Sequence, residues 1–229
     1  MSFTKILKHL IRIVDGTCLV AALSVLCAFK TKRASLVPVK HDAVQVLALS
    51  PNRFIADLRE LEKTGVFEVH QFPEYWQYFG LALYGSEDRR RNVFMTRFLK
   101  AYQRHLPFDV VIGAAVWYGQ DIPWGAAAQR QGIPYVILHK ECFKPEPLQS
   151  STSVKKALKF GPFMGERLLV HNRPMADAFV ANGYVAVKNV AVCGAMRMDP
   201  FVNKALSSEG LRSRRRKRPL VTFFSFTLG

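Results

Sequence analysis

The stretch "FDVVIGAAVWYGQDIPWGAAAQRQGIPYVILHKE", residues 108–141, holds the pattern that decides the fold. Two predicted strands, 108–116 and 133–141, contain the apolar runs 110–116 and 133–138 and flank a segment, 119–132, whose composition suits a helix closed by Gly132. Unbroken apolar runs are typical of strands buried on both faces, and a helix between two of them is the crossover of a parallel sheet. The stretch therefore predicts a strand–helix–strand unit.

The same alternation continues on both sides of this unit. The other predicted strands are 43–50, 66–72, 167–172 and 188–194, and the other predicted helices are 53–65, 87–105, 153–160 and 173–183. This order predicts an α/β protein: a Rossmann-like parallel sheet with helices on both faces. Ligands of such sheets bind beyond the carboxyl ends of the strands, so the following loops are the candidate sites. The first of these loops, 50–54, carries no glycine-rich dinucleotide signature.

The balance of charge points to a polyanionic partner. The chain has 33 Lys and Arg against 17 Asp and Glu, a formal net charge of +16. Nucleic acid, acidic lipid headgroups and phosphorylated substrates all suit such a charge. The densest basic run, 212–218, is interpreted either as a solvated linker or as a nucleic-acid arm. Because no base-reading or stacking module accompanies it, nucleic acid is not the expected partner.

The cysteines and the first residues indicate the compartment. Cys18, Cys27, Cys142 and Cys193 form no metal-ligand spacing, so we expect no metal site, no disulfide and a cytoplasmic protein. The segment 3–30 has an apolar part shorter than the roughly 20 residues that a membrane span needs.

Three interpretations of this N-terminal segment stay open. Its first half alternates Ile6, Leu7, Leu10, Ile13 and Val14 with basic residues, as in a helix lying on an anionic membrane surface. That interpretation predicts a protein peripheral at the inner face of the membrane. A single membrane span and an ordinary core helix are the alternatives.

Polar and aromatic side chains follow the two strands of the opening stretch. The loop after the first of these strands contains Trp117 and Tyr118, whose flat aromatic faces suit sugar rings. Gln120 and Asp121 follow in the same loop. Ordinary packing between helix and sheet is the alternative for this loop.

The second strand of the stretch ends in the most polar of these loops. It ends in His139, Lys140 and Glu141, which supply a general base and a cation for an anionic group. Glu141 is the first choice for the base and His139 the second. The alternative is a salt-bridged loop with His139 partly in the core.

Two further loops carry candidates. Asn172 can cap the helix that follows it, and the free N–H groups of that helix, with Arg173, can hold an anion. Capping alone also explains Asn172. After the last strand, Gly194 begins a turn that carries Arg197 and Asp199.

The segment "NRPMADAFVANGYVAVKNVAVCGAMRMDPF", 172–201, carries a resemblance. It resembles the N-terminal half of GT-B glycosyltransferases, and more narrowly bacterial enzymes of surface or capsular polysaccharide synthesis and relatives of the CDP-glycerol glycerophosphotransferases. The matching positions are Gly183, Val190, Val192, Gly194, Arg197 and Asp199. The resemblance covers about residues 43 to 229.

The resemblance implies a function for the chain. In such enzymes this half holds the acceptor and often the catalytic base, while a second domain holds the nucleotide-sugar, and no cofactor or metal is needed. It implies a membrane-associated helix over 1–40, an acceptor-side domain over 41–203, a basic linker over 204–218 and the first strand of a donor domain over 219–229.

On this interpretation the chain binds a lipid-linked or polysaccharide acceptor and transfers nothing by itself, because the donor domain is not there. The alternative is a basic, non-catalytic protein that binds membrane or nucleic acid.

Overall fold

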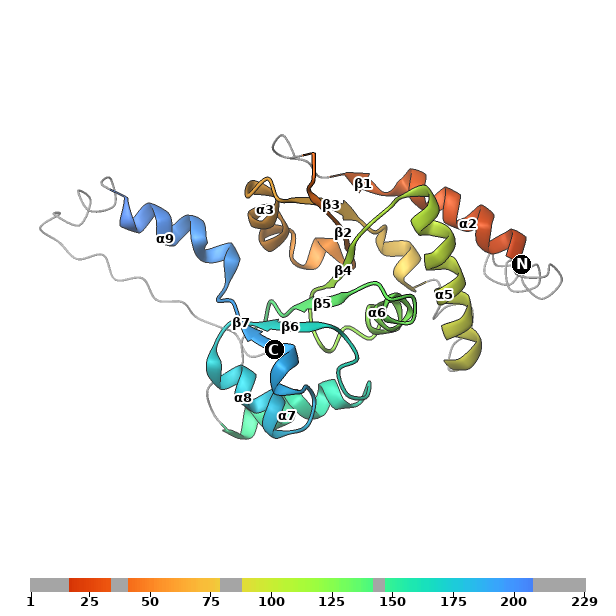
Figure 1. Cartoon of the computed structure of the whole chain (residues 1–229). Coiled ribbons are helices and arrows are strands. Elements are labelled where there is room, and N and C mark those ends of the chain that lie inside the picture. Colours follow the sequence, from red (N-terminus) through yellow and green to blue (C-terminus); the bar gives the residue numbers. More distant parts are fainter. Residues whose placement is uncertain (1–16, 34–40, 79–87, 142–146, 208–229) are drawn as a thin grey trace, which may run out of the picture. The chain divides into compact units, whose positions relative to one another are not determined.

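A computed structural model gives the structure of residues 17–33, 41–78, 88–141 and 147–207 (Figure 1). It divides into two compact units, Met1–Ala195 and Met196–Gly229. The first unit contains the following elements: α2 (Thr17–Lys30), β1 (Lys32–Arg33), β2 (Val44–Ala48), α3 (Ile55–Lys63), β3 (Phe67–Gln71), α5 (Asp88–His105), β4 (Val110–Gly113), α6 (Ile122–Gln129), β5 (Tyr135–Leu138), α7 (Pro147–Leu158), β6 (Arg167–Val170), α8 (Arg173–Ala181) and β7 (Val190–Val192). The second unit contains α9 (Asp199–Leu206).

The sheet has the order β1-β3-β2-β4-β5-β6-β7. The six strands from β2 to β7 run parallel, and each lies inside one of the six predicted ranges, so the predicted Rossmann-like α/β fold is confirmed. Sequence reasoning missed the edge strand β1, which pairs antiparallel with β3 through Lys32 and Arg33. Two basic residues give no hydrophobic periodicity, so nothing marked this strand.

The order of the strands reverses between β2 and β4. From β2 the chain crosses to β3 on one side, then returns past β2 to β4 and continues outward through β5, β6 and β7. Loops that leave β2 and β4 therefore diverge at their carboxyl ends. In open α/β sheets this reversal is where ligands bind, because the diverging loops leave space there.

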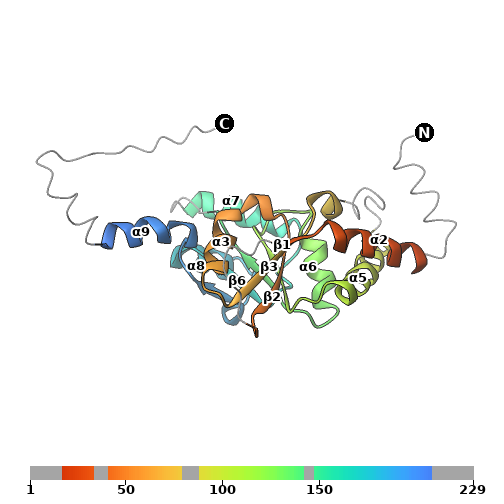
Figure 2. The ribbon, with the colours of Figure 1, turned by 90° about the horizontal axis from the view of Figure 1, so that it is seen from above.

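The reversal also distributes the helices over the two faces of the sheet. Crossover connections between parallel strands are right-handed. A connection that moves toward one edge of the sheet and a connection that moves toward the other edge therefore place their helices on opposite faces. Figure 1 and Figure 2 show α3 on one side of β2 and β3, with α2, α5 and α6 on the other. Both faces around β2 are thus covered, which explains why Val46, Leu47, Ala48 and Leu49 are all buried.

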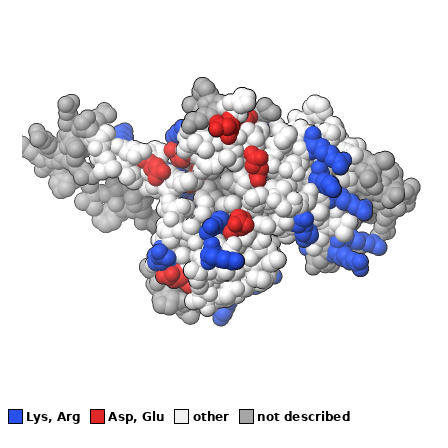
Figure 3. Space-filling view, in the orientation of Figure 1, with Lys and Arg blue, Asp and Glu red and all other residues white. Residues whose placement is uncertain are grey.

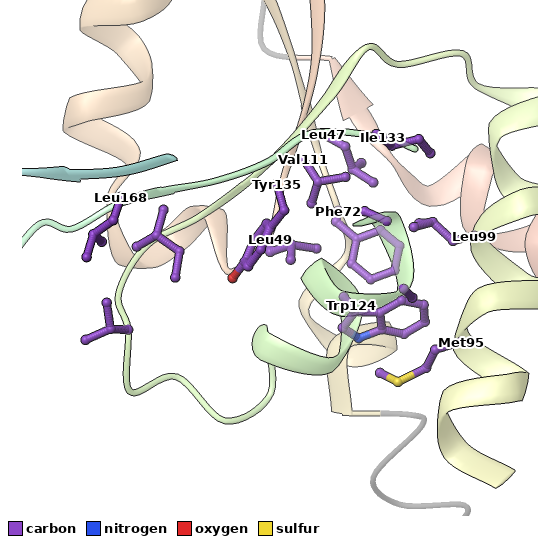
Figure 4. Close-up of a cluster of buried hydrophobic side chains, with 14 of the residues drawn as sticks. Leu47, Leu49, Phe72, Met95, Leu99, Val111, Trp124, Ile133, Tyr135 and Leu168 are labelled. Atoms are coloured by element: carbon purple, nitrogen blue, oxygen red, sulfur yellow. The ribbon is translucent and has the colours of Figure 1, made fainter. Parts of the chain in front are cut away.

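The main core lies between the sheet and α5 with α6. Figure 4 shows Phe72 from the end of β3, Trp124 from α6, and Met95 and Leu99 from α5 converging there. All four are buried, and each such side chain contributes roughly 1.5–3 kcal/mol of transfer free energy. The indole Nε1 of Trp124 donates to the carbonyl oxygen of Gln77 at 3.0 Å, so the tryptophan buries no unpaired donor.

Helix α2 packs along α5. Val20, Leu23 and Cys27 on one side of α2 are buried, and Thr31 shares a 2.6 Å hydrogen bond with the Tyr102 hydroxyl of α5. For Thr17–Lys30 the structure therefore shows a helix of the core. The amphipathic segment before it lies outside the described residues. No helix in the described part of the chain has the length and apolar character that crossing a membrane requires.

Three boundaries differ from the predictions. Helix α7 begins at Pro147, ahead of the predicted 153–160, since Pro is well suited to a first helical turn. Helix α9 ends at Leu206, inside the range predicted as linker. The compact units divide after Ala195, whereas we placed the boundary after residue 203. The basic run 212–218 and the predicted strand 219–229 lie outside the described residues.

Candidate functional site

The candidate site lies at the carboxyl ends of β2, β4 and β5. Two backbone hydrogen bonds align the ends of neighbouring strands. They run from Leu49 N to Ile112 O at 2.8 Å and from Lys140 N to Ala114 O at 3.1 Å. These bonds bring the loop after β5 against the loop after β4, beside the point where the strand order reverses. Residues that are far apart in the sequence therefore meet at one edge of the sheet.

Tyr118 connects the three loops. Its hydroxyl donates to Glu141 Oε1 at 3.1 Å. The Arg53 guanidinium carbon, from the loop after β2, and the Lys140 Nζ each lie 5.8 Å from the centroid of its ring, within the range of cation–π attraction. The sequence analysis named Tyr118, Lys140 and Glu141, and the structure brings all three together.

The hydroxyl of Tyr118 is a hydrogen-bond donor at neutral pH. Partial burial, together with the charge of Glu141, raises the pKa of Tyr118 to about 12. A neutral phenol beside a carboxylate and two cations gives a site with donors, an acceptor and positive charge. Such a set suits a ligand that carries both hydroxyl groups and an anionic group.

A buried polar cluster, formed by Ser50, Gln77 and Asp121, lies beside this site. Ser50 Oγ is 2.7 Å from Asp121 Oδ1 and 2.8 Å from Gln77 Oε1, and Gln120 Nε2 donates to it at 3.3 Å. Ser50 holds a left-handed backbone conformation with φ of 47°, which turns the chain sharply from β2 into the next turn. Such a conformation is uncommon for a residue other than glycine and often occurs at functional sites.

The Ser50–Gln77–Asp121 cluster has more acceptors than protons when Asp121 is ionised. The single hydroxyl proton of Ser50 cannot serve both Gln77 Oε1 and Asp121 Oδ1. A neutral Asp121 removes this conflict, because its carboxyl group donates to Ser50 while Ser50 donates to Gln77. Burial raises the pKa of Asp121 to about 7, which agrees with a proton held there near neutrality.

His139 and Trp117 pack in the interior. The His139 ring lies edge-on to Trp117 with centroids 4.6 Å apart, and it also contacts Phe179 of α8. The imidazole is fully buried, and burial, with the charges of His171 and Lys140, lowers its pKa to about 3. The structure thus shows His139 in the core, which agrees with one part of the alternative interpretation of this loop. A catalytic role of His139 stays a prediction.

Asn172 caps α8. Its Oδ1 accepts a 3.0 Å hydrogen bond from the backbone N–H of Met175, in the geometry expected of an N-cap. The neighbouring Arg173 is exposed at the first position of the helix. The structure thus shows the capping role of Asn172, and anion binding there stays a prediction.

The local backbone structure explains part of the motif that carries the resemblance. Gly183 and Gly194 have φ of 71° and 75°, values that favour glycine, at the turns before and after β7. Val190 and Val192 belong to β7 itself. Arg197 and Asp199 belong to the second unit, in the turn before α9 and at its start. Substrate binding by Arg197 and Asp199 stays a prediction.

Comparison of the chain with protein-family models, curated proteins and solved structures finds no match. Among the described residues there is also no group of three or more His, Cys, Asp or Glu side chains placed to hold a metal ion.

Sequence reasoning missed Ser50, Arg53 and Gln77. The sequence could have indicated Ser50 and Arg53, since both lie in the loop after the first predicted parallel strand, where the strand order reverses. The absence of a glycine-rich signature in that loop excluded only a dinucleotide, while other ligands remained open. Gln77 lies in residues 74–78, a helical segment within a loop that carried no sequence signal.

Proposed function

We propose that this protein is the acceptor-binding half of a glycosyltransferase of surface polysaccharide or glycolipid synthesis. The acceptor would bind at the carboxyl ends of β2, β4 and β5. The meeting of Arg53, Tyr118, Lys140 and Glu141 at this edge carries the proposal. These side chains come from three different loops and converge beside the reversal of strand order, where α/β sheets bind their ligands.

The chemistry of these side chains fits an acceptor with hydroxyl groups and a phosphate. Arg53 and Lys140 supply two positive charges, and guanidinium and ammonium groups are the usual partners of phosphate. Tyr118 and Glu141 supply a donor and an acceptor for sugar hydroxyls. A lipid-linked saccharide phosphate combines both features.

Glu141 is the proposed general base. In the transfer its carboxylate takes the proton of the acceptor hydroxyl, and the acceptor oxygen forms a bond to the anomeric carbon of a nucleotide-sugar. The bond from that carbon to the nucleoside diphosphate breaks, and the diphosphate leaves with the electron pair. Binding the nucleotide-sugar needs a donor-binding domain, so we propose that Met1–Ala195 by itself binds acceptor without turnover.

The exposed side of α2 favours a lipid-linked acceptor. Leu26 and Phe29 are 56% and 84% exposed, which is unusual for large apolar side chains in one helix. An apolar face of this kind can lie in the headgroup region of a membrane, as in a protein peripheral at the inner leaflet.

Binding of a simple probe tests the proposal. We would titrate the protein with glucose 1-phosphate and with uncharged methyl glucoside by calorimetry. Arg53→Gln and Lys140→Gln should each weaken glucose 1-phosphate binding about tenfold, since a hydrogen bond to a charged group is worth roughly 1.5–3 kcal/mol. Glu141→Gln should leave this binding nearly intact, because a base acts on the proton and not on the phosphate.

Lys156→Gln is the matched control. Lys156 is exposed in the last turn of α7, so the variant loses one positive charge away from the carboxyl ends of the strands. The proposed site is rejected when Arg53→Gln and Lys140→Gln bind the probe as well as Lys156→Gln does.

The alternative function, a basic protein that binds anionic surfaces without chemistry, is favoured by one observation. Figure 3 shows Lys and Arg side chains gathered over the region of α5, away from the red carboxylates of that view. The contacts of α5 are therefore developed further below.

A further inference from the structure

Helix α5 presents a row of cations to solvent. Arg89, Arg97, Lys100 and Arg104 recur at helical spacing and are exposed, while the opposite side of the helix is buried in the core. Asp88 is the only carboxylate within α5. Among the described residues none of these four cations forms an ion pair.

The first part of this row borders an open hollow of about 690 Å³. Its lining residues are Arg89, Asn92, Val93, Thr96 and Arg97 from α5 and Arg130 from the end of α6. Three guanidinium groups from two helices thus surround one space, together with a hydroxyl and an amide. None of the described residues that line the hollow is a carboxylate.

Arg130 is fixed in place at the rim of the hollow. Its Nε donates to Thr96 Oγ1 at 3.1 Å, and that hydroxyl donates to the backbone carbonyl of Asn92 at 2.7 Å. Gln131 Nε2 also donates to the backbone carbonyl of Thr96, at 3.1 Å. Two of these hydrogen bonds, from Arg130 and Gln131 to Thr96, tie the end of α6 to α5 and hold the guanidinium of Arg130 toward the others.

The environment of Arg130 favours an anion. Its partial burial lowers the pKa of the guanidinium, which means that the charge has lost part of its hydration. Within the described part of the chain, its terminal nitrogens donate to no other residue. An oxyanion in the hollow would restore the lost interactions through paired N–H···O bonds, a geometry that arginine provides and lysine does not.

We propose that the hollow between α5 and the end of α6 binds a phosphate group through Arg89, Arg97 and Arg130, with Thr96 and Asn92 as neutral partners. This site is separate from the acceptor site at the carboxyl ends of β2, β4 and β5, and it does not depend on that proposal. The phosphate can belong to a soluble compound or to a lipid headgroup.

The test compares two variants that lose the same charge from the same helix. Arg89→Gln/Arg97→Gln removes two cations of the hollow, and Lys100→Gln/Arg104→Gln removes two exposed cations of the row outside it. The full chain is titrated with inorganic pyrophosphate by calorimetry. It is also sedimented with vesicles of phosphatidylglycerol and phosphatidylcholine in equal parts and with vesicles of phosphatidylcholine alone.

We expect the wild type to bind pyrophosphate or the phosphatidylglycerol vesicles. The hollow variant should bind at least about tenfold more weakly, and the matched variant should stay within about twofold of the wild type. Arg130→Gln should reproduce the loss. Lys156→Gln, which removes one exposed cation of α7, should not.

The two binding assays, with pyrophosphate and with vesicles, identify the source of the phosphate. Binding of pyrophosphate, with loss in the hollow variant, supports a soluble phosphate compound, and binding of the charged vesicles alone, with the same loss, supports a lipid headgroup. Equal losses in the two double variants overturn the proposal, since they show a diffuse effect of charge. The absence of binding in both arms also overturns it. Circular dichroism and thermal unfolding of each variant check that the fold is kept.

Discussion

Replacing Asp121 with asparagine tests whether the Ser50–Gln77–Asp121 cluster holds a proton. The side chain is fully buried, and burial raises its pKa from the ordinary value of 3.8 to about 7. Asparagine keeps the size of the side chain and a donor for Ser50 Oγ, but it does not titrate. The variant therefore removes the ionisation and keeps the hydrogen bond.

The sign of the effect follows from the raised pKa. Between the unfolded and the folded pKa the folded protein holds a proton that the unfolded chain has lost. The stabilisation is therefore complete below the unfolded value and is lost as pH rises through about 7. With one pKa unit worth 1.36 kcal/mol, Asp121 should lower the free energy of unfolding by about 2.5 kcal/mol between about pH 5 and about pH 8.

The measurement is urea unfolding of the wild type and Asp121→Asn across this pH range. The difference in the free energy of unfolding between Asp121→Asn and the wild type should grow in favour of the variant by about 2.5 kcal/mol from the acid end to the alkaline end of this range. Burial also raises the pKa of Glu62 to about 7, but Glu62 is present in both proteins and cancels in the difference. Parallel stability profiles for the two proteins would refute a proton held at Asp121.

Two further predictions concern the fold. Asn172→Ala should cost about 1 kcal/mol in urea unfolding because it removes the N-cap of α8, and Asn172→Asp should restore most of the loss since it still accepts from Met175 N; equal losses in both variants would contradict the capping role. Gly125→Ala should destabilise by about 1–3 kcal/mol, because an added Cβ would lie 2.1 Å from the ring of the buried Tyr135, whereas Gly→Ala in an open helix stabilises. A higher melting temperature for Gly125→Ala would show that the interior of α6 has room that the structure does not indicate.

Most of the fold could be predicted from the sequence because each central strand is a local apolar run. The strands within 43–50 and 108–116 could be predicted without knowing which segments pack against them, since strands covered on both faces are mostly apolar at consecutive positions. The edge strand β1 had no such run and was missed. Helix α2 allowed three interpretations, because a helix that is apolar all round suits a membrane and a core equally.

The candidate site could be predicted only in part. Tyr118, Lys140 and Glu141 follow apolar strands directly, so their place at the carboxyl edge was visible in the sequence. Nothing local distinguished Glu141, which contacts Tyr118, from His139, whose ring turns into the core against Trp117. The two residues lie two positions apart, so the alternation of a strand would place both side chains on the same side, and only tertiary packing separates them.

The sequence by itself determined the alternation of strands and helices, the edge of the sheet that carries the candidate site, and the positive charge. These properties depend on runs of neighbouring residues and on composition, which the chain carries wherever it folds. Only the tertiary structure decided that Arg53 joins Tyr118, that Ser50 meets Asp121, and that Arg130 closes the hollow beside α5. Each of these pairs joins segments far apart in the chain, and the order of the strands, which no local pattern encodes, brings them together.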